Sequence, residues 1–437
     1  MKTWRPSATR IVLAVIAAGG LAPSAARAVD LASVLAEVAS RNPQVVVSAA
    51  RADAARERAR QAGAWETPMV ELGVVNVPTT LRFDEDPMTM KTIGVRQRVS
   101  PRSTLERRSA REGSNAAAED VKLTRQQALG AAVEAYVTAW SAGERVTATE
   151  RHLTLLTRAV DAARARYGAG SGSIDDVLRM RSEEARVRAA LASTRTEQRA
   201  SRLRLASLRG RAPEFDAERL EAPSFAPVPD DATAWLAAVD ENHPRLRAGD
   251  AEISRYRFAA GAARAGLWPM LDLMYEYGIR EPVASAAHGA EVHNMFTAKV
   301  GLSLPVFAGQ RELREAAEME AMARAAEGER RAATLELLEG VAMAHEEAHA
   351  GTAIARLLAD TVLVAERAAL DASWSAYSAG TMELGRVLDL AHNLYDDELE
   401  LTRARQQAMS AQGRALALTG RGDLFGIPMP ALPERKP

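Results

Sequence analysis

Four short segments of the chain alternate apolar and polar residues with a period of two. They are Met69–Val77, Thr92–Val99, Met270–Gly278 and Met295–Leu304. This alternation predicts β-strands that are apolar on one face and polar on the other. The segments are close in length to a strand that crosses a membrane in a β-barrel, about 9–11 residues. A soluble antiparallel sheet packed on helices fits the same pattern, and the alternation alone does not choose between the two.

The polar faces of these segments carry charges of both signs, which suits the water-filled lumen of a barrel. The candidate lumen residues are Glu71, Arg96, Arg98, Asp272, Glu276 and Lys299. Four strands cannot close a barrel, because the smallest membrane barrels have about eight. Open strand edges cannot face lipid, since each unsatisfied backbone group there costs several kcal/mol. If the strands cross a membrane, several copies must share one barrel, and three copies would give 3 × 4 = 12 strands and a usable lumen.

Two long stretches of the chain, between Pro101 and Pro213 and between Pro305 and Pro428, contain no proline. Both are rich in strong helix formers, and proline inside a helix costs about 3 kcal/mol. Each stretch has one clear turn signal, so we expect two antiparallel helical hairpins, with helices of up to about 90 Å. The predicted helices are Leu105–Tyr167, Ile174–Leu208, Gln310–Tyr377 and Met382–Leu418, with shorter helices over Pro43–Ala64 and Pro244–Gly266.

These elements occur twice in the same order, which indicates a duplicated unit. Asn42-Pro43 returns as Asn242-His243-Pro244, an offset of 244 − 43 = 201 residues. Tyr167-Gly168-Ala169-Gly170 returns as Tyr377-Ser378-Ala379-Gly380, an offset of 377 − 167 = 210. The predicted fold class is therefore mainly α with a small β portion, built from two helix–strand–strand–hairpin repeats. We place the repeats at residues 29–220 and 221–424, followed by a C-terminal tail at 425–437.

Residues 1–28 have the features of a secretory signal peptide: a basic start, a short apolar stretch and the cleavage motif Ala26-Arg27-Ala28. We therefore expect the protein to be exported. The chain contains no cysteine, so it uses no disulfide. Its formal net charge is −1, with both signs interspersed. This argues against a nucleic-acid partner, which would favour a basic stripe.

The double helix–strand–strand–hairpin order resembles the outer membrane efflux proteins, the TolC-like outer membrane factors, across essentially the whole mature chain. The motifs that carry the resemblance are Asn42-Pro43, the segment Gly301–Gln310 after the fourth strand, and Tyr-x-Ala-Gly with a following Val-Leu at each turn. The resemblance implies a homotrimer with a 12-stranded barrel in outer-membrane lipid and a periplasmic α-helical coiled-coil tunnel.

The resemblance also implies a non-enzymatic exit duct without a cofactor, working in a tripartite pump. The implied partners are a periplasmic adaptor (membrane fusion) protein and an inner-membrane transporter of the resistance-nodulation-division type. The loop Asp84–Lys91 is similar to the heavy-metal branch, which makes heavy-metal cations a candidate cargo. Ser100–Thr104 departs from the Pro-x-x-Gly-Lys common in the family, and the lipidated cysteine of many members is absent. We therefore expect the barrel alone to anchor the protein.

Charged residues just after the two predicted turns are candidates for a periplasmic gate. TolC-like proteins carry acidic residues after the second turn that ring the closed entrance, and the resemblance places Arg386 and Asp389 at the matching positions. The first hairpin has Asp176 and Arg179 there. We hypothesise that adjacent hairpins pair these charges when the tip is closed. The alternative is an exposed pair within one helix, worth about 0.3–0.5 kcal/mol and without a role in gating.

Two further patterns suggest metal chemistry. His345-Glu346-Glu347-Ala348-His349 has the HExxH spacing of zinc peptidases. It lies within a long predicted helix, with no third ligand or substrate cleft, so a histidine pair on a solvated or lumen-facing stripe is favoured. Thioethers and imidazoles bind soft metals such as Cu(I), although methionine more often fills gaps. Such side chains gather near the strands: Met88, Met90, Met270, Met274, Met295, His288 and His293.

The favoured function is an outer-membrane exit duct. A soluble periplasmic coiled-coil adaptor or scaffold is the alternative, and a zinc peptidase is a remote one. Adaptors usually carry one hairpin between lipoyl-like and barrel domains, whereas strands here interrupt twin hairpins.

Overall fold

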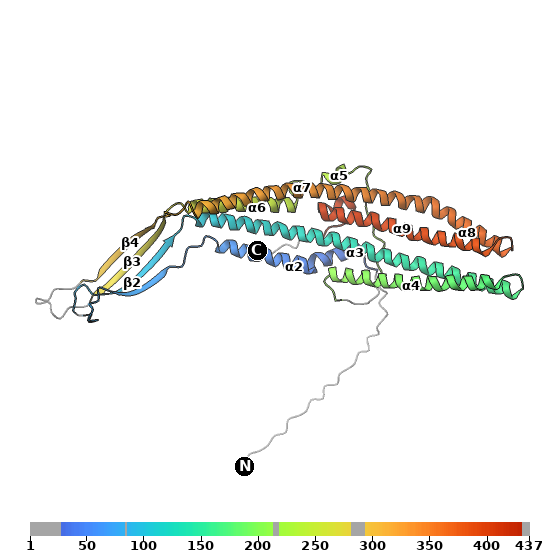
Figure 1. Cartoon of the computed structure of the whole chain (residues 1–437), viewed down its shortest axis with the longest axis horizontal. Coiled ribbons are helices and arrows are strands. Elements are labelled where there is room, and N and C mark those ends of the chain that lie inside the picture. Colours follow the sequence, from blue (N-terminus) through green and yellow to red (C-terminus); the bar gives the residue numbers. More distant parts are fainter. Residues whose placement is uncertain (1–27, 84, 213–217, 281–292, 431–437) are drawn as a thin grey trace, which may run out of the picture.

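The computed structural model describes residues 28–83, 85–212, 218–280 and 293–430. The molecule is long and narrow, with the sheet at one end and both hairpin turns at the other (Figure 1). The predicted signal peptide lies almost wholly outside the described residues, and so does Asp84 of the predicted heavy-metal loop.

The first repeat contains both strands and both arms of the first hairpin. Its elements are α1 (Leu31–Arg41), α2 (Pro43–Gln61), β1 (Met69–Val75), β2 (Met90–Val99), α3 (Ser103–Gly168) and α4 (Ile174–Leu208). The predicted strands and helices are confirmed to within a few residues. Helix α1, which the sequence analysis did not predict, buries Val34, Leu35 and Val38 on one face.

The second repeat follows the same order with one interruption. Its elements are α5 (Thr233–Leu236), α6 (Pro244–Ala265), β3 (Met270–Arg280), β4 (Met295–Ser303), α7 (Glu312–Leu357), η1 (Leu358–Val362), α8 (Leu363–Ser378), α9 (Leu384–Thr419) and η2 (Gly422–Phe425). The predicted single helix Gln310–Tyr377 is in fact α7 and α8 joined by η1, a π-helical segment. The four-residue helix α5 was also not predicted.

The four strands form one antiparallel sheet in the order β1-β2-β3-β4. Glu71 lies opposite Gly94, Gly94 opposite Glu276, and Glu276 opposite Thr297. Side chains alternate between the two faces of a strand, so this register places the predicted polar residues on one face. Within the described residues, β1 and β4 are edge strands with one neighbour each.

The shorter helices stack end to end on the return arms of the hairpins. Asn42 caps α2, and its Nδ2 donates to the carbonyl oxygen of Leu208 at the end of α4, at 2.9 Å. His243 caps α6 in the same way, and its Nε2 lies 3.3 Å from Gln126 Nε2. Gln126 also donates to the carbonyl oxygen of Ala417 near the end of α9, at 3.0 Å. Each repeat therefore continues one wall of helices from the sheet to the turns (Figure 1).

Three apolar clusters hold the described helices together, and the smallest joins Leu246 of α6 to Ala333 and Leu337 of α7. The first lies midway along the molecule, where α1, α3 and α9 meet Trp235 and Phe425, whose rings are 4.8 Å apart. The second lies nearer the turns and joins α3, α4, α8 and α9. Across the described ranges, no helix combines the length and the apolar character needed to cross a membrane.

Candidate functional site

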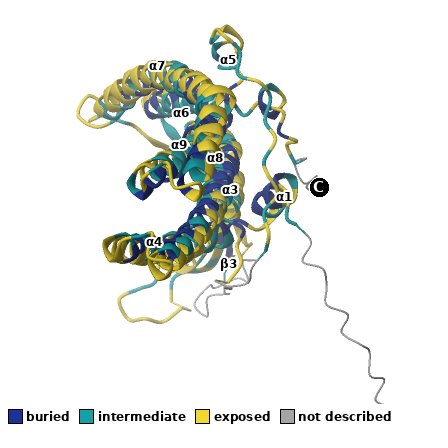
Figure 2. Ribbon diagram, turned by 90° about the vertical axis from the view of Figure 1, so that its right-hand side faces the viewer, coloured by how far each residue is buried: buried dark blue, intermediate teal, exposed yellow. Residues whose placement is uncertain are grey.

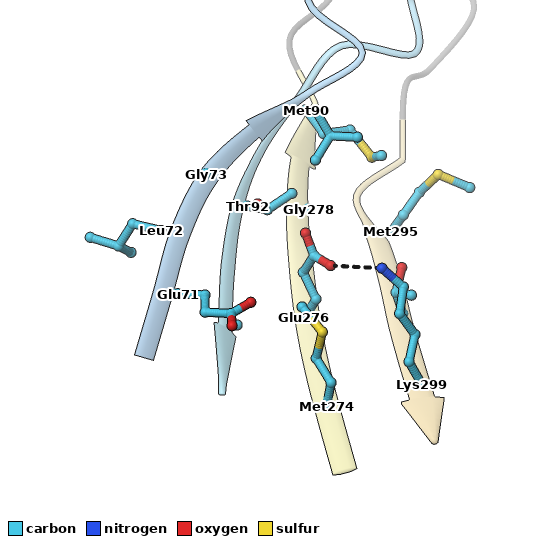
Figure 3. A pocket seen from close by; sticks show the side chains of 13 residues that line it. Glu71, Leu72, Gly73, Met90, Thr92, Met274, Glu276, Gly278, Met295 and Lys299 are labelled. Carbon is cyan, nitrogen blue, oxygen red and sulfur yellow. Dashed lines mark ion pairs between the residues drawn. The ribbon is translucent and has the colours of Figure 1, made fainter. Parts of the chain in front are cut away.

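The polar face of the sheet surrounds a hollow of about 360 Å³. Figure 3 shows Glu71 and Glu276 on this face together with Lys299. All six predicted lumen residues lie on this face, because the strands pair in the register given above. Glycines at several points of the same face leave the hollow open, since Gly73, Gly94 and Gly278 carry no side chain.

The six charged side chains form three cross-strand ion pairs. Arg96 Nη2 lies 2.8 Å from Glu71 Oε1. Arg98 Nε lies 3.0 Å from Asp272 Oδ1, and Lys299 Nζ lies 3.6 Å from Glu276 Oε2 (Figure 3). Three acids are thus matched by three bases, and the strand register adds Arg280 to the same face, so this face carries charges of both signs. Such a surface stays hydrated but does not strongly select one sign of ion.

The opposite face of the sheet is apolar and exposed. Its outward side chains come from all four strands and include two aromatic residues on β3 and one on β4. They are Val70, Leu72, Val74, Ile93, Val95, Leu271, Tyr275, Tyr277, Ile279, Phe296, Val300 and Leu302. Exposed apolar patches larger than a few hundred Å² are rare on soluble monomers. This face, together with the two open edges, is the pattern of a sheet that meets lipid on one side and water on the other.

Some of the predicted soft-metal side chains share the polar face. Met90, Met274 and Met295 line the hollow, whereas Met88 lies outside it with its sulfur 3.7 Å from Arg280 Nη2. His288 is outside the described residues. No group of three or more His, Cys, Asp or Glu side chains is placed to hold a metal ion in the part of the chain that the structure describes.

The two turns have the same backbone geometry. Gly170 and Gly380 both have positive φ, +75° and +78°, which a residue with a side chain rarely adopts. The N–H groups of Ser171 and Thr381 each close the preceding helix by donating to a carbonyl oxygen five residues earlier, at 3.0 Å. The Tyr-x-Ala-Gly motif therefore marks a helix end of the same kind in each repeat.

The predicted gate residues lie in the first turn or two of α4 and α9. Arg179 Nη2 pairs with Asp175 Oδ2 at 3.1 Å within its own helix, and not with the hairpin beside it. Arg386 and Asp389 are exposed, and neither forms an ion pair within the described part of the chain. A single chain thus does not bring the four residues together, and their pairing remains a prediction about the assembled protein.

Contacts that the sequence analysis missed join the two hairpins near their turns. The Arg166 guanidinium lies 4.6 Å from the centre of the Tyr377 ring, and its Nη1 donates to the Tyr377 carbonyl oxygen at 2.9 Å. Farther from the turns, the buried ring of His152 stacks on the ring of Tyr395, with their centres 4.4 Å apart. The centre of the His392 ring lies 5.3 Å from that of His152. Both contacts join α3 to the second hairpin, so they would resist separation of the two hairpins. No local sequence signal predicts them, because the partners are more than 200 residues apart.

The HExxH motif has a structural role. The expected solvated or lumen-facing position is wrong for His345, which is buried, whereas His349 is exposed. The Nε2 of His345 lies 2.9 Å from the carbonyl oxygen of Pro229, and its ring packs against Trp235 at 5.2 Å. In the first repeat, Tyr136 Oη is likewise within hydrogen-bonding distance of extended backbone, 2.7 Å from the Val29 carbonyl oxygen. Each long helix therefore holds an extended segment in place with one buried polar ring.

Comparison with known proteins agrees with this geometry. The sequence model of the family described as "Outer membrane efflux protein" matches residues 34–211 and 235–421, which is most of the chain. The match falls in two segments, one in each repeat.

Among curated proteins, the chain is similar to the cobalt-zinc-cadmium resistance protein CzcC of Cupriavidus metallidurans, with 26% identity over 293 residues. The aligned region spans 66% of each chain, just under two thirds of that relative.

Two solved structures have the same fold. The outer-membrane channel OprN superposes with a TM-score of 0.73 at 20% identity and covers 89% of both chains. The outer membrane protein VceC of Vibrio cholerae superposes with a TM-score of 0.74 at 17% identity, covering 89% of this chain and 96% of VceC.

The family match removes both alternatives, the periplasmic adaptor and the zinc peptidase. The chain therefore belongs to the outer membrane efflux protein family, whose members are non-enzymatic channels of the Gram-negative outer membrane that extend into the periplasm.

Proposed function

We propose that three copies of this chain form the exit duct of a tripartite efflux pump that exports divalent heavy-metal cations. In this proposal the four-stranded sheets close one 12-stranded barrel, and the hairpins form a tunnel that ends at the two kinds of turn. The periplasmic adaptor meets the tunnel, and the inner-membrane transporter of the resistance-nodulation-division type supplies the cargo. The duct performs no chemical step and contributes a wall and an entrance.

The amphipathic sheet is the observation that carries the duct. One face presents three ion pairs around a hollow, and the other presents exposed apolar side chains. An open sheet with these faces is unstable in lipid, because the backbone groups of β1 and β4 lack partners. Pairing β4 of one copy with β1 of the next would satisfy both edges. The hollow would then become part of a continuous aqueous lumen.

The proposed cargo rests on the similarity to the cobalt-zinc-cadmium resistance protein. The mixture of acidic and basic side chains on the polar face is compatible with hydrated cations, since neither sign of charge dominates it. The charges beside the turns, the half-buried Asp176 and the exposed Arg179, Arg386 and Asp389, are the proposed gate that the partner proteins open.

The test uses a strain from which this chain's gene has been deleted. We expect the wild-type protein to appear in the outer-membrane fraction as a heat-modifiable trimer and to restore growth on cobalt, zinc or cadmium. Growth on dyes and antibiotics serves as the control for a general duct. A trimer that restores drug tolerance but not metal tolerance would overturn the cargo. A monomer in the soluble periplasmic fraction would overturn the duct.

A further inference from the structure

Two methionine side chains flank a glycine at the end of the sheet farthest from the helices. Met90 begins β2 and Met295 begins β4, with Gly278 of β3 between them (Figure 3). The strand register places Met295 directly opposite Gly278. Met90 pairs with Arg280, two residues further along β3, so Met90 lies diagonally across from Gly278 on the same face. We call Met90 and Met295 the methionine pair.

Gly278 leaves the space in which the two side chains can meet. A Cβ added at Gly278 would lie 2.9 Å from the sulfur of Met90 and 3.5 Å from its Cβ, so Met90 already occupies this space. The Cβ atoms of directly opposite residues are about 4.5–5.5 Å apart, and the sulfur of Met295 is two bonds beyond its own Cβ. The sulfur of Met295 can therefore reach the same space from the other side. Glycine inside a strand often marks the close approach of a ligand.

Methionine most often fills gaps in a buried core, and that role does not fit the methionine pair. Buried residues gather where the helices meet (Figure 2), and the three apolar clusters among the described residues contain neither member of the pair. Both members line the polar hollow instead, and Met295 is 42% exposed. An apolar side chain that stays beside water gains little hydrophobic stabilisation, so the sulfur is the feature to explain.

Two other thioethers near this face are engaged by cationic side chains. Met88 Sδ lies 3.7 Å from Arg280 Nη2, and Met274 Sδ lies 4.0 Å from Arg96 Nη2. A guanidinium beside a sulfur repels a metal cation at that position. Within the described residues, neither sulfur of the methionine pair accepts from such a donor. Of the four thioethers, these two are therefore the ones available to a cation.

The charges nearest the pair also allow a cation. Arg280 lies on the same face but does not line the hollow, since its Nε donates to a backbone carbonyl oxygen of the preceding loop at 2.8 Å. Glu276 lines the hollow two residues from Gly278. Its partner Lys299 lies opposite Met274, further from the pair along the sheet. The charge that lies closest within the hollow is therefore acidic.

We propose that the methionine pair binds one soft monovalent cation, Cu(I) or Ag(I), between its two sulfurs. Thioethers are soft, neutral ligands that select such ions, whereas Zn²⁺ is bound by thiolate, imidazole and carboxylate groups. The site lies within the sheet of a single chain. Its place in a lumen rests on the proposed function, in which three copies would present three pairs at the outer mouth of the barrel.

Silver titration of the purified wild-type trimer in detergent tests the site. Calorimetry with silver nitrate in chloride-free buffer should show one Ag⁺ bound per chain. Met90→Leu and Met295→Leu should each weaken binding by about 10–100-fold or more, since even groups that only support a metal ligand contribute that much. Met88→Leu and Met274→Leu are the matched controls and should bind silver as the wild-type protein does.

Gly278→Ala tests the same site with both methionines still present. The added Cβ would displace the sulfur of Met90, so silver binding should weaken. Heat-modifiable trimer on a gel checks that each variant folds. Affinity equal to wild type in Met90→Leu or Met295→Leu, or an equal loss in Met88→Leu, would overturn the site.

A protection experiment on the wild-type protein needs no variant. Hydrogen peroxide converts methionine to its sulfoxide, and mass spectrometry follows each methionine separately. Silver should slow the oxidation of Met90 and Met295 and leave that of Met88 unchanged, whereas zinc should protect none of them. Oxidation of the pair at the same rate with and without silver would show that the pair does not bind the ion.

The outcomes separate the site from the duct. A trimer that supports growth on cobalt, zinc or cadmium but does not bind silver through the pair would overturn the site and leave the duct standing. A monomer that binds one Ag⁺ through the pair would support the site while the duct fails, because both methionines belong to one sheet.

Discussion

At the scale of single residues, the charges beside the turns differ in sign between the repeats. Asp176 corresponds to Arg386, and Arg179 corresponds to Asp389, at an offset of 210. If hairpins alternate around an entrance, unlike charges stand at the same height on every neighbouring pair. Ion pairs between neighbouring hairpins would hold the entrance closed, and a change of charge at one partner would break them.

Charge reversal at Arg386 should therefore open the entrance. We expect Arg386→Glu to raise the single-channel conductance in planar bilayers, because it places like charges at the proposed pair. Arg403→Glu is the control, since Arg403 is an exposed, paired arginine on α9 far from the turn. Equal conductance of the Arg386→Glu and wild-type channels would show that these residues do not form the gate.

His152 should make the hairpins sensitive to acid. Burial, with a smaller contribution from the neighbouring His392, lowers its pKa to about 4, although Glu398 opposes the shift. The unfolded chain binds the proton at about 6.5, so the stabilisation is full above that pH and is lost as the pH falls toward 4. The whole effect is on the order of 3 kcal/mol. Urea unfolding measures the free energy of unfolding at pH 7.5 and at pH 5. Between these two pH values it should fall less for His152→Phe than for the wild-type protein. Equal decreases would show that His152 is not the group responsible.

At the scale of elements, α3 and α9 approach each other closely where Gly130 faces Ala417. A Cβ at Gly130 would lie 2.3 Å from Ala417 Cβ and 2.9 Å from the Gly413 carbonyl oxygen. No real contact is that short, so the two helices would have to move apart.

Gly130→Ala should destabilise the protein by about 1–3 kcal/mol through overpacking. Gly328, on α7, has nothing within 4 Å of its added Cβ. Gly328→Ala should instead be neutral or stabilising by up to about 1 kcal/mol, because alanine favours helix. Thermal unfolding followed by circular dichroism compares the two. A Gly130→Ala variant as stable as Gly328→Ala would show that the helices are not in close contact there.

The strands and hairpins could be predicted because their signals are local. Period-two alternation marks the strands, and the two proline-free stretches with one turn each mark the hairpins. Helix α1 has a local signal that was not used, since Leu31, Val34, Leu35 and Val38 follow helical spacing after the N-cap Asp30. Helix α5 and the π-helical segment have only four and five residues, too few to show a period. The face that carries the six charged residues was predictable from alternation, but their pairing depends on the strand register. The burial of His345 was not predictable, since its partner Pro229 lies in an extended segment over 100 residues away.

At the scale of the whole molecule, the exposed apolar face of the sheet determines where the protein can reside. Val300 lies on this face and is 67% exposed, whereas Thr297 on the same strand lines the hollow on the other side. Introducing the same residue at each position therefore tests the apolar face and the polar face of the sheet separately.

Val300→Arg should reduce the amount of folded trimer in the outer membrane, because an arginine facing lipid near the bilayer centre costs about 2–4 kcal/mol. Thr297→Arg should leave the amount of trimer unchanged, since its side chain faces water. Heat-modifiable trimer on a gel measures both. Equal yields would mean that the apolar face does not contact lipid.

The π-helical segment η1 also explains how two unequal repeats end level with each other. Helix α3 has 66 residues, whereas α7, η1 and α8 have 46, 5 and 16, one residue more than α3. A π-type turn absorbs one additional residue as a local bulge instead of extending the helix by a further step. At this one place, the number of residues in the helix can therefore change without changing the length of the helix. An insertion or deletion of one residue in a long helix can then be tolerated during evolution, because both hairpin turns still end at the same level and present the same surface to a partner.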